Sequence, residues 1–218
     1  PGVYPLSFDL TILPDSTRAV PDTSVSADTT LVFIGDSVTF GYGVDDDQTW
    51  VNLIARALPA VHVVNAGVSG YNSTNVARAV AQYPDADALV YLIVNNDAEP
   101  EKLPAFDQQR SPDTSSWLAL YLLHLPEYLS PVSAEAEIAR GDLSRYFAHL
   151  RAILADDRVL ALAFDDAFGR MTVERGFGVP LIERYTDRVS PADGHPGVPG
   201  NQQIAAQILP LVRARFRL

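Results

Sequence analysis

The chain has 218 residues, and its 16 basic and 27 acidic side chains give a formal net charge of −11. A hydrophobic share of 47% and a charged share of 20% indicate a globular protein of one domain or two small ones. The acidic balance argues against binding to nucleic acid or to an anionic membrane surface, and the absence of cysteine excludes disulfides, thiolate metal sites and cysteine nucleophiles.

Residues 1–28 contain several prolines among serine, threonine and aspartate, and we expect an extended arm ahead of a domain at 29–218. Apolar and polar residues alternate over residues 6–12, which is typical of an edge strand. The chain starts at Pro1 rather than Met, so we expect the natural N-terminus to be missing, and an extracytoplasmic (periplasmic or secreted) location is favoured. No apolar run approaches the ~20 residues of a membrane helix, so we expect no membrane span in this chain.

Short apolar runs then alternate with segments of helical periodicity. In chain order we expect a strand at 31–34, a helix at 48–58, a strand at 61–64, a helix at 73–83, a strand at 88–94, a long helix at 134–154, a strand at 159–164, a helix at 165–175, a short strand at 181–182 and a helix at 199–216. Residues 98–132 break this rhythm and form an expected insertion near the active-site edge, with one apolar helix near 117–125. The alternation predicts a three-layer α/β/α sandwich around a mostly parallel five-stranded sheet.

Ligands of such sheets bind beyond the carboxyl ends of the strands, so the residues after each predicted strand are the candidates. Ser37 stands two residues past the first strand, on a turn bracketed by glycines. Glycines follow the second strand, and Asn95, Asn96 and Asp97 follow the third. Taken singly, each of these segments equally suits an ordinary turn or helix cap; their joint occurrence at strand ends favours a functional site.

Only one of the four histidines lies in a predicted loop. His195 follows Asp193 by two positions, whereas His62, His124 and His149 fall within predicted strands or helices and are expected to be structural or surface residues. Loops on a rigid scaffold commonly carry reactive groups, which favours a function for His195.

These segments together resemble the SGNH hydrolases, the GDSL-type esterase/lipase superfamily. The first and last motifs of that family are similar to Gly35-Asp36-Ser37-Val38 and Asp193-Gly194-His195-Pro196. Its second and third motifs are similar to residues 64–70 and 94–97, where Val94 stands in place of the usual glycine. The resemblance spans about residues 30–212.

The resemblance implies an esterase without a metal or other cofactor. Ser37 would be the nucleophile, His195 its general base and Asp193 the carboxylate that orients the base. The backbone N–H groups of Ser37 and Gly70 and the Asn96 side chain would form the oxyanion hole. Residues that follow strand ends are expected to contact the substrate, namely Tyr42, Tyr71 and Asn95.

Other interpretations stay open at this point. The expected partner is a small-molecule or carbohydrate ester, and a carbohydrate O-acetyltransferase or deacetylase would use the same acyl-enzyme. The valine at position 94 suggests a third interpretation, a binding module that keeps the cleft but has lost the catalytic activity. Asp45, Asp46 and Asp47 lack the spacing of a calcium loop and are expected to form a solvated loop. Substrate identity and oligomeric state are not set by the sequence.

Overall fold

The computed structural model describes residues 7–99, 142–191 and 193–218. Within these ranges, five parallel strands form the central sheet in the order β2-β1-β3-β4-β5. Their bounds are β1 Thr29–Gly35, β2 Val61–Gly67, β3 Ala88–Ile93, β4 Val159–Phe164 and β5 Leu181–Ile182. The predicted five-stranded parallel sheet is confirmed, and its last two strands have the predicted bounds.

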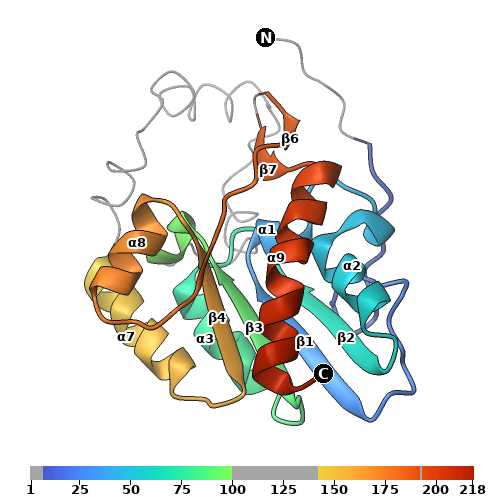
Figure 1. The fold of residues 1–218 in the computed structure, drawn as a ribbon, viewed down its shortest axis with the longest axis horizontal. Coiled ribbons are helices and arrows are strands. Elements are labelled where there is room, and N and C mark those ends of the chain that lie inside the picture. The colour runs from blue at the N-terminus through green and yellow to red at the C-terminus, as the bar shows by residue number, and fades with distance from the viewer. Residues whose placement is uncertain (1–6, 100–141, 192) are drawn as a thin grey trace, which may run out of the picture.

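Helices cover both faces of this sheet (Figure 1). Their bounds are α1 Ser37–Phe40, α2 Trp50–Ala57, α3 Ser73–Gln82, α7 Leu143–Leu154, α8 Ala167–Glu174 and α9 Val198–Phe216. Helices α2 and α9 share one apolar core with one face of the sheet, and α3, α7 and α8 share another with the opposite face. The three-layer α/β/α sandwich is therefore confirmed. None of the described helices is both long enough and apolar enough to span a bilayer.

The apolar runs produce this arrangement because successive side chains of a strand point to opposite faces. In β1, Leu31 and Phe33 belong to the core under α2 and α9, whereas Val32 and Ile34 belong to the core under α3 and α7. A strand buried on both faces needs apolar residues at every position, which is why these strands read as continuous hydrophobic runs.

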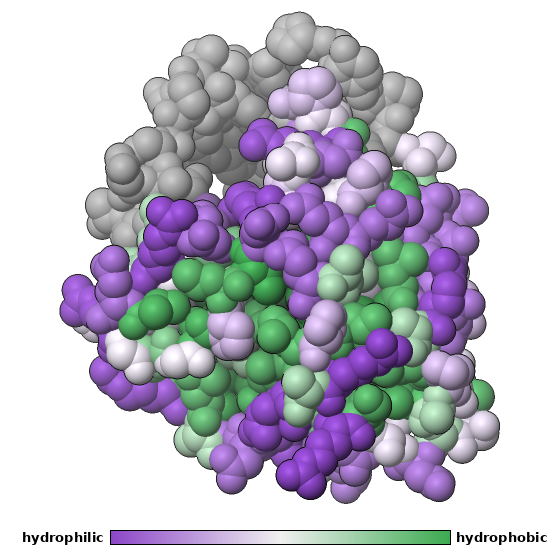
Figure 2. Space-filling model, viewed as in Figure 1, coloured by the Kyte–Doolittle hydropathy of each residue, from purple (hydrophilic) through white to green (hydrophobic). Residues whose placement is uncertain are grey.

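The sheet topology places a crevice beside β1. From β1 the chain moves outward to β2 and then returns to β3 on the other side of β1. The order therefore reverses between β1 and β3, and the crevice lies beyond their carboxyl ends. Figure 2 shows polar residues gathered around the β6–β7 region at this end of the molecule, with apolar residues visible between α8 and α9.

The N-terminal arm corrects one expectation. Residues 7–11 form no strand; Ile12 and Arg18 instead make isolated antiparallel bridges, Ile12 to Arg18 and Arg18 to Asn65 of β2. The Thr23 hydroxyl accepts a hydrogen bond from the Val63 N–H at 2.6 Å. The arm follows the edge of β2 through single bonds because its prolines and turns prevent a continuous ladder.

The acidic loop at residues 45–47 also differs from expectation. Asp46 is buried, and its carboxylate pairs with the fully buried Arg18 at 2.8 Å. The expected solvated loop is therefore wrong for Asp46. An acidic run by itself does not reveal that a cation from the arm, 28 positions earlier, comes to lie against it.

Two further differences concern the late part of the chain. The segment around His195, expected as a loop, forms an antiparallel hairpin of β6 Arg188–Ser190 and β7 Asp193–Pro196. Of the expected helix at 134–154, residues 134–141 lie outside the described residues, and α7 covers Leu143–Leu154. The helix expected near 117–125, and residues 100–132 of the expected insertion, lie outside the described residues.

Candidate active site

Ser37 is positioned by a sharp transition from β1 to the single-turn helix α1. Asp36 caps this helix, since its side chain accepts a hydrogen bond from the Val38 N–H at 2.9 Å. Gly35 permits the turn, because a Cβ at this position would collide with the Thr39 hydroxyl. The helix ends at Gly41, whose φ of 85° lies in the left-handed region that favours glycine. Ser37 is thus held at the carboxyl end of β1, facing the crevice.

His195 and Asp193 lie on β7, where the His195 ring stands between Ser37 and the Asp193 carboxylate. The Ser37 Oγ lies 2.8 Å from His195 Nε2, and His195 Nδ1 lies 2.6 Å from Asp193 Oδ1. A carboxylate at this distance favours the proton on Nδ1, which leaves Nε2 as an acceptor for the serine hydroxyl. Asp36 Oδ2 also faces the hydroxyl, but at 3.3 Å. The three groups therefore form a series of hydrogen bonds.

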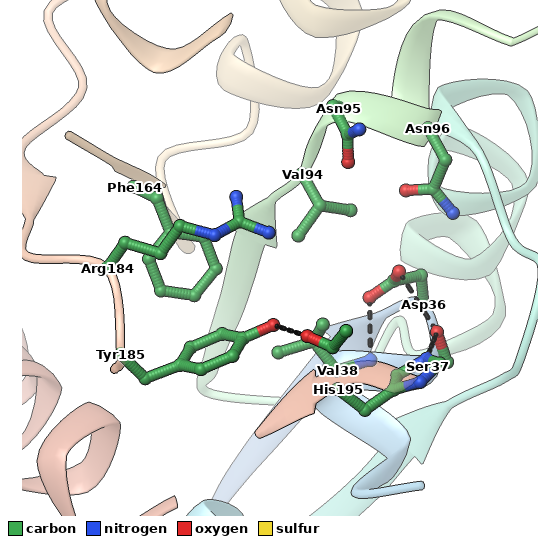
Figure 3. A pocket seen from close by; sticks show the side chains of 11 residues that line it. Asp36, Ser37, Val38, Val94, Asn95, Asn96, Phe164, Arg184, Tyr185 and His195 are labelled. Carbon is green, nitrogen blue, oxygen red and sulfur yellow. Dashed lines mark hydrogen bonds between the residues drawn. The ribbon is translucent and has the colours of Figure 1, made fainter. Parts of the chain in front are cut away.

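The hairpin that carries His195 is braced by two buried side chains. The Tyr185 hydroxyl donates to the Gly194 carbonyl at 2.6 Å (Figure 3), and burial raises the pKa of this tyrosine. Asn201 of α9 donates to the Pro196 carbonyl at 3.0 Å and accepts from the Trp50 N–H at 2.9 Å. These bonds flank His195 on both sides and link β7 to the helical layer.

The third strand contributes two amides through the short turn Asn95–Ala98. The Asp97 carboxylate folds this turn back by accepting from the Val94 N–H at 2.8 Å. The Asn96 Nδ2 donates to the Tyr71 carbonyl at a long 3.4 Å, and its buried Oδ1 has no hydrogen-bond partner among the described residues. Figure 3 shows both asparagines above Ser37, on the opposite wall of the cavity.

A cavity of about 310 Å³ joins these groups. Its described lining is Asp36, Ser37, Val38, Val94, Asn95, Asn96, Phe164, Arg184, Tyr185, Gly194 and His195. The volume falls at the lower end of the range typical of small-molecule sites.

The cavity lining contains three residues that sequence reasoning missed: Phe164, Arg184 and Tyr185. Phe164 is the last residue of β4, and the other two follow β5 closely. A signal was available, because the rule that points to residues after each strand applies equally to these positions.

The remaining predicted site residues are placed differently. The Tyr42 ring packs against the His195 ring, with centroids 4.7 Å apart, so it borders the Ser37–His195–Asp193 series. Gly70 adopts a φ of 82° and is exposed, and it does not appear among the described residues that line the cavity. Tyr71 lines a different, smaller cavity with Tyr83. Their predicted contacts with substrate stay predictions.

Carboxylates beneath the site are deeply buried. Burial raises the pKa of Asp36 and raises that of Asp97 well above its ordinary range, the latter with a further contribution from the nearby Asp36. Within the described part of the chain, no group of three or more His, Asp or Glu side chains is arranged to hold a metal ion.

Comparisons with known proteins place this geometry in context. The sequence model of the GDSL-like Lipase/Acylhydrolase family matches residues 33–203. No curated protein sequence matches the chain.

Among solved structures, a carbohydrate acetylesterase family member from Sinorhizobium meliloti has 14% identity and a TM-score of 0.51, and covers 87% of this chain and 100% of its own. An aryl esterase from M. Smegmatis has 12% identity and a TM-score of 0.51, with coverage of 85% and 99%. The psychrotrophic esterase EstA from Pseudoalteromonas sp. has 14% identity and a TM-score of 0.50, with coverage of 88% and 100%. At these identities the likeness establishes a shared fold.

Proposed function

The chain belongs to the GDSL-like lipase/acylhydrolase family, and from this premise we propose that it hydrolyses carboxylic esters through a covalent acyl-enzyme on Ser37. One observation carries the proposal: Ser37 Oγ, His195 Nε2, His195 Nδ1 and Asp193 Oδ1 stand in series, with hydrogen bonds of 2.8 and 2.6 Å. A serine hydroxyl is a weak nucleophile, and a neighbouring base that is itself oriented by a carboxylate activates it.

In the proposed acylation, the Ser37 oxygen attacks the ester carbonyl carbon while His195 Nε2 takes the hydroxyl proton. Asp193 accepts the Nδ1 hydrogen bond throughout, and so stabilises the imidazolium that forms. The tetrahedral intermediate then collapses: the bond from carbon to the alcohol oxygen breaks, and His195 returns the proton to that oxygen. The alcohol leaves, and the acyl group stays on Ser37.

Deacylation repeats these steps with water as the nucleophile. His195 takes a proton from water, the resulting hydroxide oxygen bonds to the acyl carbon, and the Ser37 oxygen leaves with the proton from His195. The carboxylic acid is released. In both halves negative charge develops on the carbonyl oxygen, and we assign its stabilisation to the Ser37 and Gly70 backbone N–H groups and the Asn96 amide.

The test is hydrolysis of a short-chain p-nitrophenyl ester by the purified protein, measured as the release of p-nitrophenol. Ser37→Ala should abolish hydrolysis, and a fluorophosphonate probe should label the wild type at Ser37 by mass spectrometry.

Ser73→Ala is the matched control for this test. Ser73 also begins a helix near a histidine, but its Oγ lies 3.4 Å from His149 Nδ1, and its geometry is not that of an activated nucleophile. The proposal is overturned if hydrolysis persists in Ser37→Ala. It is also overturned if the folded wild type neither hydrolyses esters nor is labelled by the probe, a result that would favour a binding module.

A carbohydrate O-acetyl substrate is the second candidate. The neighbour described as a carbohydrate acetylesterase family member, together with the two asparagines in the cavity lining, is the observation that favours it. Product analysis separates the possibilities: acetate release from acetylated sugars indicates a deacetylase, whereas acetyl transfer from an activated ester to a sugar hydroxyl indicates a transferase.

A further inference from the structure

Arg184 brings a positive charge to the wall of the cavity that holds Ser37 and His195. It follows β5 by two positions, and Figure 3 shows its guanidinium reaching toward Val94 and Asn95. Arg184 is the only lysine or arginine among the described residues that line this cavity. A cation in a substrate cavity calls for an explanation in terms of the substrate.

The guanidinium is held in place by three neighbours. Its Nη1 pairs with Asp166 Oδ2 at 2.7 Å, and its Cζ lies 5.4 Å from the Phe164 ring centroid and 5.5 Å from that of Tyr185. Both rings belong to buried residues. Because an ion pair and two aromatic contacts restrain the guanidinium, less side-chain entropy is lost when a ligand binds to it than for an unrestrained arginine.

Asp166 leaves much of this charge available. A guanidinium has five N–H donors, and the bond to Asp166 uses one of them at Nη1. The other oxygen of Asp166 accepts hydrogen bonds from the Phe168 and Gly169 N–H groups, both at 3.0 Å, at the start of α8. Part of the carboxylate's charge is therefore balanced by the helix rather than by the arginine.

We propose that Arg184 makes this enzyme selective for esters that carry a carboxylate or phosphate group close to the scissile bond. This selectivity rests on the proposed ester hydrolysis at Ser37. A planar guanidinium presents paired N–H groups that fit two oxygens of an anion, which a neutral acyl or alkyl group cannot offer. The anion would bind across the cavity from the catalytic series, beside the aromatic wall of Phe164 and Tyr185.

The experiment compares kcat/KM for pairs of esters that differ in one anionic group. For the acyl side the pair is p-nitrophenyl hemisuccinate and p-nitrophenyl butyrate; for the alcohol side it is 4-acetoxybenzoate and 4-acetoxytoluene, with 4-acetoxyphenyl phosphate as the phosphate arm. The ratio of anionic to neutral kcat/KM is the readout, because it cancels differences in the amount of active enzyme.

The wild type should prefer the anionic ester in one of the two pairs, and Arg184→Gln should lower that ratio about 10-fold, the order expected for a partly exposed, charge-assisted hydrogen bond. Arg184→Lys should retain part of the preference, since lysine keeps the positive charge but lacks the planar pair of N–H donors. Added salt should reduce the wild-type ratio. A comparison of 4-acetoxyphenyl phosphate with 4-acetoxybenzoate then shows whether a phosphate or a carboxylate fits better.

Arg170→Gln is the matched control. Arg170 forms the same kind of ion pair, with Asp165 at 2.6 Å, on the neighbouring helix and outside the cavity lining, so its loss should leave the ratio unchanged. The inference is overturned if esters are hydrolysed with no anionic preference in either pair, or if the preference survives in Arg184→Gln. Absence of all ester hydrolysis together with absence of Ser37 labelling would instead contradict the proposed function itself.

Discussion

Asn96 and Asn95 are neighbours in one turn, and both line the cavity that holds Ser37. The Asn96 Nδ2 donates to the Tyr71 carbonyl at a long 3.4 Å, and the Asn96 side chain also interacts with Asp36. An oxyanion accepts hydrogen bonds, so the Nδ2 group of Asn96 is the donor that would bind it. This bond would strengthen in the transition state, when negative charge develops on the carbonyl oxygen.

Replacing Asn96 by alanine should therefore lower kcat by about 10²–10³ and change KM little, because the lost donor acts on charge that develops during the reaction. Asn95→Ala, in the same turn and cavity, should instead change mainly KM if it contacts the ground-state substrate. Steady-state kinetics on one ester decides between them. Equal effects of both changes on kcat would mean that the turn as a whole, and not the Asn96 amide, supports catalysis.

At the level of single residues, the sequence could predict which groups meet but not all of their neighbours. Ser37, Asp193 and His195 were predictable because each adjoins a recognisable motif at the sheet edge, and the structure brings them within hydrogen-bond distance. The position of Tyr71 was not predictable, since the cavity it lines is shared with residues of the N-terminal arm and of α3 that no motif contains. Arg184 was missed because no motif contains it.

At the level of elements, the N-terminal arm acts as a clamp on the loop that follows α1. The guanidinium of Arg18 donates to the carbonyls of Phe40, Gly41 and Val44, at 3.0, 2.6 and 2.6 Å, in addition to its ion pair with Asp46. This loop carries Tyr42, whose ring packs on His195. Through this loop the arm supports the position of Tyr42 beside His195, although the arm lies outside every motif.

Arg18→Met should destabilise the protein by about 3–5 kcal/mol, because it leaves the Asp46 carboxylate and three carbonyls without their buried donor. Adding Asp46→Asn should recover part of this loss by removing the uncompensated charge. Urea unfolding measures both. Arg56→Met is the control: its ion pair with Asp22 links the arm to α2 but is exposed, so its loss should cost no more than about 1 kcal/mol. Similar losses in Arg18→Met and Arg56→Met would exclude the clamp.

The arm also shows why elements are predicted unevenly. Strands with apolar residues at every position, such as β4, were predicted to the residue, since burial on both faces leaves an unmistakable pattern. The arm's path depends instead on one buried arginine and on long-range bonds to β2, and local periodicity cannot reveal either. The β6–β7 hairpin is short and rich in glycine and proline, which reads as a loop.

At the level of the whole molecule, buried polar side chains lie beneath the site. Asp97 is fully buried there, and its side chain interacts with the buried Tyr91 hydroxyl. Burial raises the pKa of Asp97 well above its ordinary value, and Asp36 and Glu99 add repulsion. The unfolded chain ionises this group near its ordinary pKa of ~3.9, while the native protein holds the proton to higher pH.

The free energy of unfolding should therefore contain a contribution from Asp97 that is full below pH ~4 and is lost as pH rises toward the native pKa. Asp97→Asn keeps an acceptor for the Val94 N–H and removes this loss. Its stability relative to wild type should increase as pH rises above the ordinary carboxyl pKa of ~3.9 and towards the raised native pKa, by at most about 1.4 kcal/mol per pH unit. Urea unfolding at several pH values provides the measurement.

Asp156→Asn should show the opposite trend. The Arg158 side chain holds the pKa of Asp156 below its ordinary value, so the stabilisation from this carboxylate is present at neutral pH and disappears as pH falls.

A stability difference between Asp97→Asn and wild type that does not vary with pH would mean that Asp97 is ionised in the native protein at the lowest pH tested.

The hydroxyl and the imidazole that meet in the crevice come from positions 158 apart in the chain. In the proposed mechanism neither group can attack an ester without the other. A fragment of the chain that holds only one of them would therefore be inactive, and ester hydrolysis by this mechanism would report that β1 and β7 have come together.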